Sequence, residues 1–143
     1  MGDALFEAFV GHLPPSVNEM YVYTTRGPRP SAKMKRFKSD AKSDILRGLD
    51  FSKPPLDPGG AFCLEIDFFM PALYNKGCAT GKAKTRFKRR DVSNLIKVAE
   101  DVVADVVGID DSSFRRVSCA KYDSAESGSP VGFRVRVKKW EDL

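Results

Sequence analysis

The chain has 143 residues, of which 42% are hydrophobic and 30% are charged, and its formal net charge is +5. A chain of this length can bury the core of one domain, and its composition excludes a disordered protein. No stretch approaches the roughly 20 apolar residues that span a bilayer, and the acidic N-terminus does not resemble a secretory signal. We therefore expect one cytoplasmic domain over residues 1–143 that makes no contact with a membrane.

The positive charge is concentrated in one segment. Seven basic residues and no acidic residue lie between positions 76 and 90, so the remainder of the chain carries −2. Basicity confined to one segment favours contact with a polyanion over a generally basic surface. The seven residues are Lys76, Lys82, Lys84, Arg86, Lys88, Arg89 and Arg90.

Cysteine and histidine usage excludes several classes of site. The three cysteines, Cys63, Cys78 and Cys119, are far apart and form no C-x-x-C pair. This pattern argues against a disulfide framework or a zinc knuckle and favours free thiols in a reducing compartment. His12 is the only histidine, which leaves little material for a Ser-His-Asp triad or a histidine-rich metal site.

The first half of the chain predicts a strand and a helix separated by loops. Apolar residues at 5–12 favour an opening strand, which Pro14-Pro15 must end. The proline, glycine and aromatic residues of segment 14–30 indicate an irregular loop. Ser31 is a candidate N-cap for a helix that continues to about Leu49, because apolar residues then recur at helical spacing.

The second half predicts a strand, a helix and two further strands. Residues 61–70 alternate in the manner of a strand, and residues 92–107 carry a broad apolar stripe of helical period. Gly108 is expected to end that helix. Strands follow near 113–122 and at 131–139. The resulting order, β-α-β-α-β-β, predicts an α+β fold with a small mixed sheet and two helices packed on one face.

A cluster of polar residues on and after the second helix suggests a catalytic site. Asp91 lies at the start of the helix, and Asn94, Lys97 and Asp101 follow on one helical face, with Asp110-Asp111 just beyond the helix. Carboxylates are the ligands that Mg²⁺ prefers, and Mg²⁺ can activate water for phosphodiester hydrolysis. A neighbouring lysine can neutralise the charge that develops on the phosphate. The same residues are also compatible with a helix cap, a surface ion pair and a turn.

These residues resemble the motif of the RusA-type Holliday junction resolvases. The family pattern Arg-Asp-x-Asp-Asn-x-x-Lys, a later helical Asp and an Asp-Asp pair are matched by Arg90-Asp91-Val92-Ser93-Asn94-Leu95-Ile96-Lys97, Asp101 and Asp110-Asp111. The segment Leu13-Pro14-Pro15-Ser16-Val17-Asn18 is similar to the family's opening Pro-Pro-Ser-x-Asn. The likeness extends over about residues 13–122 in consistent order.

The resemblance implies a RusA-like fold and a homodimer that binds four-way DNA junctions and nicks them with Mg²⁺, for which Mn²⁺ can substitute. It implies roles in DNA recombination and repair, in the nucleoid or, for a phage-encoded protein, in the host cytoplasm. Asp91, Lys97 and Asp111 would be catalytic, with Asp91, Asp111 and Asp110 as metal ligands. Ser93, Asn94 and Asp101 would support the site. The DNA contacts would come from the seven residues of segment 76–90 together with Asn18, Arg26 and Arg29.

Ser93 departs from the family pattern, because a neutral hydroxyl replaces the second carboxylate of Asp-x-Asp. Two interpretations follow. Another acid, Asp110, Glu65 or Asp67, restores the missing ligand, or the protein binds junctions with little or no cleavage. A third hypothesis is a basic α+β protein that binds RNA or a protein partner.

The loop at 14–30 leaves a further alternative open. Tyr21, Tyr23, Arg26 and Arg29 can stack on exposed bases and hold phosphates. The same aromatic residues can instead anchor the loop on the core.

Overall fold

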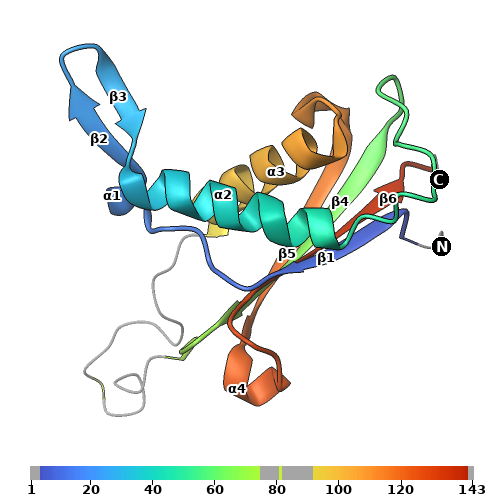
Figure 1. Cartoon of the computed structure of the whole chain (residues 1–143). Coiled ribbons are helices and arrows are strands. Elements are labelled where there is room, and N and C mark those ends of the chain that lie inside the picture. The colour runs from blue at the N-terminus through green and yellow to red at the C-terminus, as the bar shows by residue number, and fades with distance from the viewer. Residues whose placement is uncertain (1–3, 75–80, 82–91, 142–143) are drawn as a thin grey trace.

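The computed structural model describes residues 4–74, 81 and 92–141. Figure 1 shows a twisted sheet with two long helices in front of it and a separate hairpin. The strands are β1 (Phe6–Val10), β2 (Tyr21–Thr24), β3 (Gly27–Pro30), β4 (Phe62–Met70), β5 (Phe114–Asp123) and β6 (Gly132–Lys139). The helices are α1 (Val17–Met20), α2 (Ala32–Arg47), α3 (Val92–Val107) and α4 (Ser124–Ser127), with a 3₁₀ turn, η2, at Asp111–Ser113.

The main sheet has four strands in the order β1-β6-β4-β5. Strands β4 and β5 are parallel, whereas β6 runs antiparallel to both β4 and β1. A parallel pair needs a crossover connection, and α3 supplies it between β4 and β5. The sheet is therefore mixed, and the predicted α+β fold with its β-α-β-α-β-β order of main elements is confirmed.

Helix α2 begins at the predicted cap. The Ser31 hydroxyl accepts a hydrogen bond from the Met34 backbone N–H at 3.1 Å, which satisfies one of the free donors of the first turn. Phe37, Ala41 and Ile45 are buried one turn apart along the inner face. The helix ends at Gly48, where a Cβ would lie 2.9 Å from the Ala8 Cβ, so only glycine allows α2 to approach β1 this closely.

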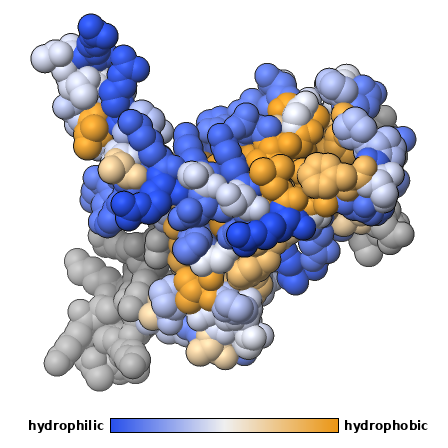
Figure 2. Space-filling view, viewed as in Figure 1, coloured by the Kyte–Doolittle hydropathy of each residue, from blue (hydrophilic) through white to orange (hydrophobic). Residues whose placement is uncertain are grey.

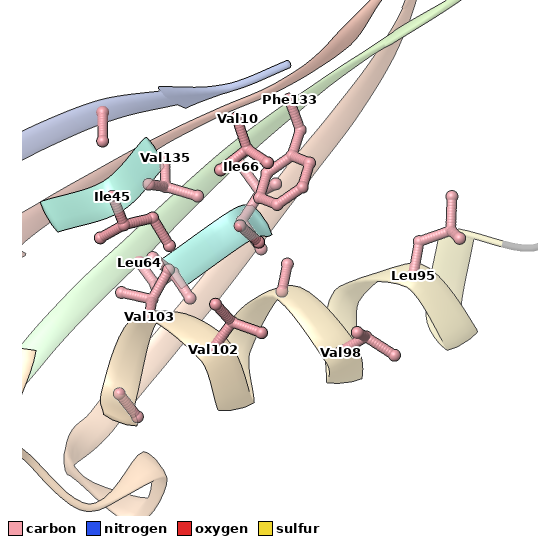
Figure 3. Close-up of a cluster of buried hydrophobic side chains, with 14 of the residues drawn as sticks. Val10, Ile45, Leu64, Ile66, Leu95, Val98, Val102, Val103, Phe133 and Val135 are labelled. Atoms are coloured by element: carbon pink, nitrogen blue, oxygen red, sulfur yellow. The ribbon is translucent and has the colours of Figure 1, made fainter. Parts of the chain in front are cut away.

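Helix α3 has the bounds that its apolar stripe predicts. Val102 and Val103 point toward Leu64 of β4 and Ile45 of α2 (Figure 3), and all four side chains are almost fully buried. Burying an aliphatic side chain of this size contributes about 1.5–3 kcal/mol. Gly108 ends the helix with φ +77°, and its N–H reaches the Ala104 carbonyl at 3.0 Å. This packing fixes α3, and with it the chain that follows, against the sheet.

The two faces of the sheet differ in chemistry. Leu64 and Ile66 of β4 face the helices, whereas the alternating residues Glu65 and Asp67 lie on the opposite face. There Asp67 pairs with Arg134 at 2.9 Å, and Glu65 pairs with the ammonium of Lys138 at 3.1 Å. The helices thus cover one face of the sheet, as predicted, and cross-strand ion pairs occupy the other.

The prediction that segment 14–30 is an irregular loop was wrong. It contains helix α1 and the antiparallel hairpin β2–β3. Prolines normally exclude a strand, but Pro28 and Pro30 oppose Tyr23 and Tyr21 at alternate positions. Their missing N–H groups can therefore face away from β2, where a two-stranded ribbon needs no donor. Gly27, with φ +101°, supplies the turn.

Candidate active site

The described part of the predicted cluster centres on Lys97, in the second turn of α3. Its ammonium donates a hydrogen bond to Asp111 Oδ2 at 2.9 Å and lies 3.2 Å from Asp101 Oδ1. Asp101 is one helical turn further along α3, whereas Asp111 comes from η2, beyond the end of the helix. Three residues that the sequence motif groups together are therefore in contact in the structure.

Local hydrogen bonds position Asp111. After the left-handed turn at Gly108, the side chain of Ile109 is buried against the core. The Asp110 carboxylate then accepts a hydrogen bond from the Ser112 backbone N–H at 2.9 Å and caps η2. The Asp110 carbonyl accepts from the Ser113 N–H, also at 2.9 Å. Asp110 thus shapes the turn that presents Asp111, while its own carboxylate is engaged with the backbone.

The charge state of the site follows from these contacts. The hydrogen bonds to Asp111 and Asp101 raise the pKa of Lys97 well above its usual value. Lys97 is therefore a cation at neutral pH and can act as a positive charge but not as a base. Hydrogen bonds from Ser112 hold the pKa of Asp110 below its usual range. Asp110 is consequently an acceptor and cannot serve as a proton donor.

Glu100 is a charged neighbour of the Lys97 cluster that sequence reasoning missed. It is half-buried, and desolvation raises the pKa of its carboxyl, an effect that Lys97 opposes and that Asp111 and Asp101 reinforce. Glu100 therefore lies within electrostatic range of all three. The signal in the sequence is its position three residues after Lys97, which places both side chains on neighbouring parts of one helix surface.

The first turn of α3 carries two further predicted residues. Ser93 is exposed and Asn94 is half-buried. Ser93 precedes Lys97 by four residues and Glu100 by seven, so the three share one helix face. The position of the absent family carboxylate is therefore on the Lys97 side of α3.

Several predicted residues lie outside the described part of the chain. They include Asp91 and the basic residues Lys76, Lys82, Lys84, Arg86, Lys88, Arg89 and Arg90. Of the other predicted DNA contacts, Asn18 is exposed on α1, and Arg26 and Arg29 are exposed on the hairpin. None of these three is in the Lys97 cluster.

Glu65 and Asp67 do not join the site. Both point to the face of the sheet away from α3, and each is paired with a basic residue of β6, Lys138 or Arg134. The structure therefore does not place either carboxylate beside Lys97 as a substitute for the side chain missing at Ser93.

A family model described as endodeoxyribonuclease RusA matches residues 12–137. The chain belongs to the RusA endodeoxyribonuclease family. The RusA match includes the hairpin, α3 and the Lys97–Asp111 contact, and RusA enzymes are Holliday junction resolvases that act on branched DNA. No curated protein matches the sequence. Among the described residues, no helix is long and apolar enough to cross a membrane.

RusA resolvases generally depend on a divalent metal, and the chemistry of the site is compatible with one. Its described donors are the carboxylate oxygens of Asp101 and Asp111, which suit a hard cation such as Mg²⁺. No three acidic, histidine or cysteine side chains among the described residues are grouped closely enough to hold a metal ion. The described residues alone therefore do not form a complete metal site.

Proposed function

We propose that this protein is a Mg²⁺-dependent endonuclease that binds four-way DNA junctions as a homodimer and nicks their strands. We further propose that residues 1–143 act as one domain, in recombination and repair within the cytoplasm. The observation that carries the proposal is the contact between Lys97 and Asp111 within a sequence that the RusA family model matches. A lysine held by two carboxylates beside a metal-compatible site is suited to metal-assisted phosphodiester hydrolysis.

Each residue of the site has a distinct part in the proposed reaction. Asp111 and Asp91 would hold the ion, with Asp110 as a further ligand or as the cap that orients Asp111. Mg²⁺, when bound, polarises the scissile phosphate and lowers the pKa of a water molecule. Lys97 remains positively charged and stabilises the negative charge that develops on the phosphate oxygens. Asp101 restrains the lysine through the ion pair at 3.2 Å.

The basic segment would hold the DNA backbone against this site. Its seven cations directly precede Asp91 in the sequence. Each phosphate that such a residue neutralises contributes about −0.9 to the slope of log K against log[salt]. The proposal therefore includes binding that is tight at low salt and weakens steeply as salt rises. A homodimer would place two such surfaces on the arms of one junction and allow paired nicks.

A second candidate is a junction-binding protein that cuts weakly or not at all. Ser93 favours it, because a hydroxyl is a poorer Mg²⁺ ligand than the carboxylate of the family pattern, and Glu65 and Asp67 are engaged on the other face of the sheet. Under this candidate the DNA-binding residues keep their roles and the Lys97 cluster is a remnant of a metal site.

A nicking assay on a synthetic four-way junction separates the two candidates. The nuclease proposal expects cleavage products with Mg²⁺ or Mn²⁺, which Asp111→Asn removes. Asp105→Asn is the matched control, because Asp105 is also an exposed carboxylate of α3 but pairs with Lys42 of α2. Tight binding without products, at high protein concentration and with either metal, would support the second candidate.

A further inference from the structure

The hairpin β2–β3 stands apart from the rest of the fold. Figure 1 shows it projecting away from both the sheet and the helices, and Figure 2 shows it as a separate, largely hydrophilic protrusion. All four residues of β2 are exposed, and the exposed fractions of Tyr21 and Tyr23 are 48% and 87%. The interpretation that this segment anchors on the core through its tyrosines is therefore wrong for this structure.

The register of the hairpin gathers the rings on one face. Tyr21 opposes Pro30 and Tyr23 opposes Pro28, while Arg29 opposes Val22 at the intervening position. Side chains alternate between the two faces of a strand. One face of the hairpin therefore presents the two tyrosines and the prolines opposite them, and the other face presents Arg29. Two aromatic rings exposed side by side contribute little to the core, and grouped exposed apolar surface is typical of a contact with a partner.

The base of the hairpin is fixed to the body of the protein. Met20 is buried, and its carbonyl accepts a hydrogen bond from the Ser31 N–H at 2.8 Å. The Ser31 hydroxyl donates to the Glu19 carbonyl and accepts from the first turn of α2. The hairpin thus leaves the body at the point where α2 begins, and in Figure 1 α3 begins at the same side of the molecule.

The charge around the hairpin identifies the kind of partner. Residues 20–39, which include the hairpin and the first half of α2, contain six basic residues and no acidic residue. Within the described part of the chain, only Lys33 of these six forms an ion pair, with Glu19. Positive charge at the start of a helix opposes the helix dipole, so this arrangement is unfavourable for the fold by itself. It is complementary to a polyanion.

We propose that the hairpin is a branch-recognition arm, in which Tyr21 and Tyr23 stack on bases that are unstacked at a DNA branch point. Arg26 at the turn of the hairpin and the basic start of α2 hold the adjacent phosphates. The inference rests on the proposed function in taking branched DNA as the substrate. Aromatic rings beside cations are the means by which proteins hold single-stranded nucleic acid. The faces of bases in a continuous duplex are covered by their neighbours, so the rings find a partner only where stacking is interrupted.

Binding measured in EDTA, where no cleavage can occur, tests the arm. The probes are a fluorescent four-way junction, a second junction with 2-aminopurine at the branch, and a linear duplex of the same length. The test variant is Tyr21→Ala with Tyr23→Ala, and Tyr21→Phe with Tyr23→Phe keeps the rings. Phe51→Ala is the matched control, since Phe51 is an 82% exposed aromatic residue beyond the other end of α2.

Loss of stacking is worth about fivefold to a hundredfold in affinity for each base. We expect the double alanine variant to bind the junction at least about tenfold more weakly. We also expect it to lose the change in 2-aminopurine fluorescence that accompanies binding of the unmodified protein. Its binding to the duplex should change by less than about twofold. The phenylalanine variant and Phe51→Ala should behave like the unmodified protein. Equal weakening on both DNAs, or no weakening on the junction, would overturn the inference.

Other outcomes separate this inference from the proposed function. Unmodified protein that binds junctions through the tyrosines but never cuts them would contradict the nuclease proposal and support the arm. Protein that cuts junctions while the double alanine variant binds them normally would contradict the arm alone. Dissociation of a dimer by the double alanine substitution, seen by sedimentation, would show that the hairpin contacts a second copy and would overturn the inference. Absence of any junction binding would contradict both.

Discussion

Replacing Lys97 with methionine separates a catalytic role from a structural one. The ammonium contacts Asp111 at 2.9 Å and Asp101 at 3.2 Å, but the side chain is 63% exposed. Exposed ion pairs typically contribute about 0.2–1 kcal/mol each, so Lys97→Met should lower the free energy of unfolding by about 1 kcal/mol. In a domain of this size that change corresponds to about 3 °C in Tm. Methionine keeps most of the length and apolar stem of lysine.

The effect on cleavage should be much larger. Removing one preorganised donor from a transition state costs about 2.7–4 kcal/mol, which lowers the rate by about 10²–10³-fold. Lys42→Met is the matched control, because Lys42 also forms an ion pair with an aspartate of α3, Asp105, at a site away from the cluster. With one ion pair in place of two, it should lose about half as much stability and keep its cleavage rate.

The assay combines thermal unfolding with single-turnover nicking of a four-way junction. The catalytic role of Lys97 would be refuted if Lys97→Met cleaved within about threefold of the unmodified protein while the Tm fell as expected, because the predicted loss is at least about 10²-fold. It would also be refuted if both lysine variants lost the same fraction of activity.

Three further outcomes are expected. Ser93→Asp should raise the Mg²⁺-dependent nicking rate and lower the Mg²⁺ concentration at half-maximal rate, because it restores a carboxylate on the Lys97 side of α3. An unchanged rate and unchanged Mg²⁺ dependence would contradict this expectation. Gly108→Ala should lower the free energy of unfolding by about 1–2 kcal/mol in denaturant titrations, since φ is +77° there; an unchanged midpoint would contradict the stated role of the turn. Lys97 has a pKa raised in the folded state, so the stability it confers is complete at neutral pH and is lost only as the pH rises above the usual lysine value. The stability difference between Lys97→Met and the unmodified protein should therefore be constant between about pH 6 and pH 9, well below the unperturbed lysine pKa of about 10.4, and a difference that vanished within this range would contradict the assignment.

Helix α3 was predictable because its periodicity and its limits are local properties. An apolar stripe of helical period extends over the whole helix. Gly108 ends the helix because glycine readily adopts the left-handed conformation found there. Strand β4 was predictable for the same reason, since alternation along residues 62–70 matches alternation between the two faces of the sheet. In β4 the burial pattern follows the sequence pattern through Phe68, after which Phe69 and Met70 are both buried.

The hairpin could not be predicted by the same reasoning. Its strands have no buried face, so hydrophobic alternation gives no signal for them, and two prolines in β3 argue against a strand. What permits the strand is the pairing register, which puts Pro28 and Pro30 opposite Tyr23 and Tyr21. That register is a relation between two segments and is not a property of either one.

The candidate site was predictable in part. The spacing of Lys97 and Asp101 implies their contact, because residues four apart are neighbours on a helix. The approach of Asp111 to Lys97 depends on how the chain turns after α3, which the motif resemblance implied and helical periodicity did not. Glu100 was missed because it lies outside the family motif, and its electrostatic link to Asp111 becomes evident only in three dimensions.

We propose that Asp111, beside Lys97, belongs to a metal site completed by Asp91. Diffraction from a crystal soaked in Mn²⁺, with anomalous data to locate the ion, tests it most directly. We expect an anomalous peak within bonding distance of carboxylate oxygens of both Asp91 and Asp111, and no peak at this position in crystals of Asp111→Asn. An ion bound elsewhere, or no peak at Asp111 at saturating Mn²⁺, would contradict it.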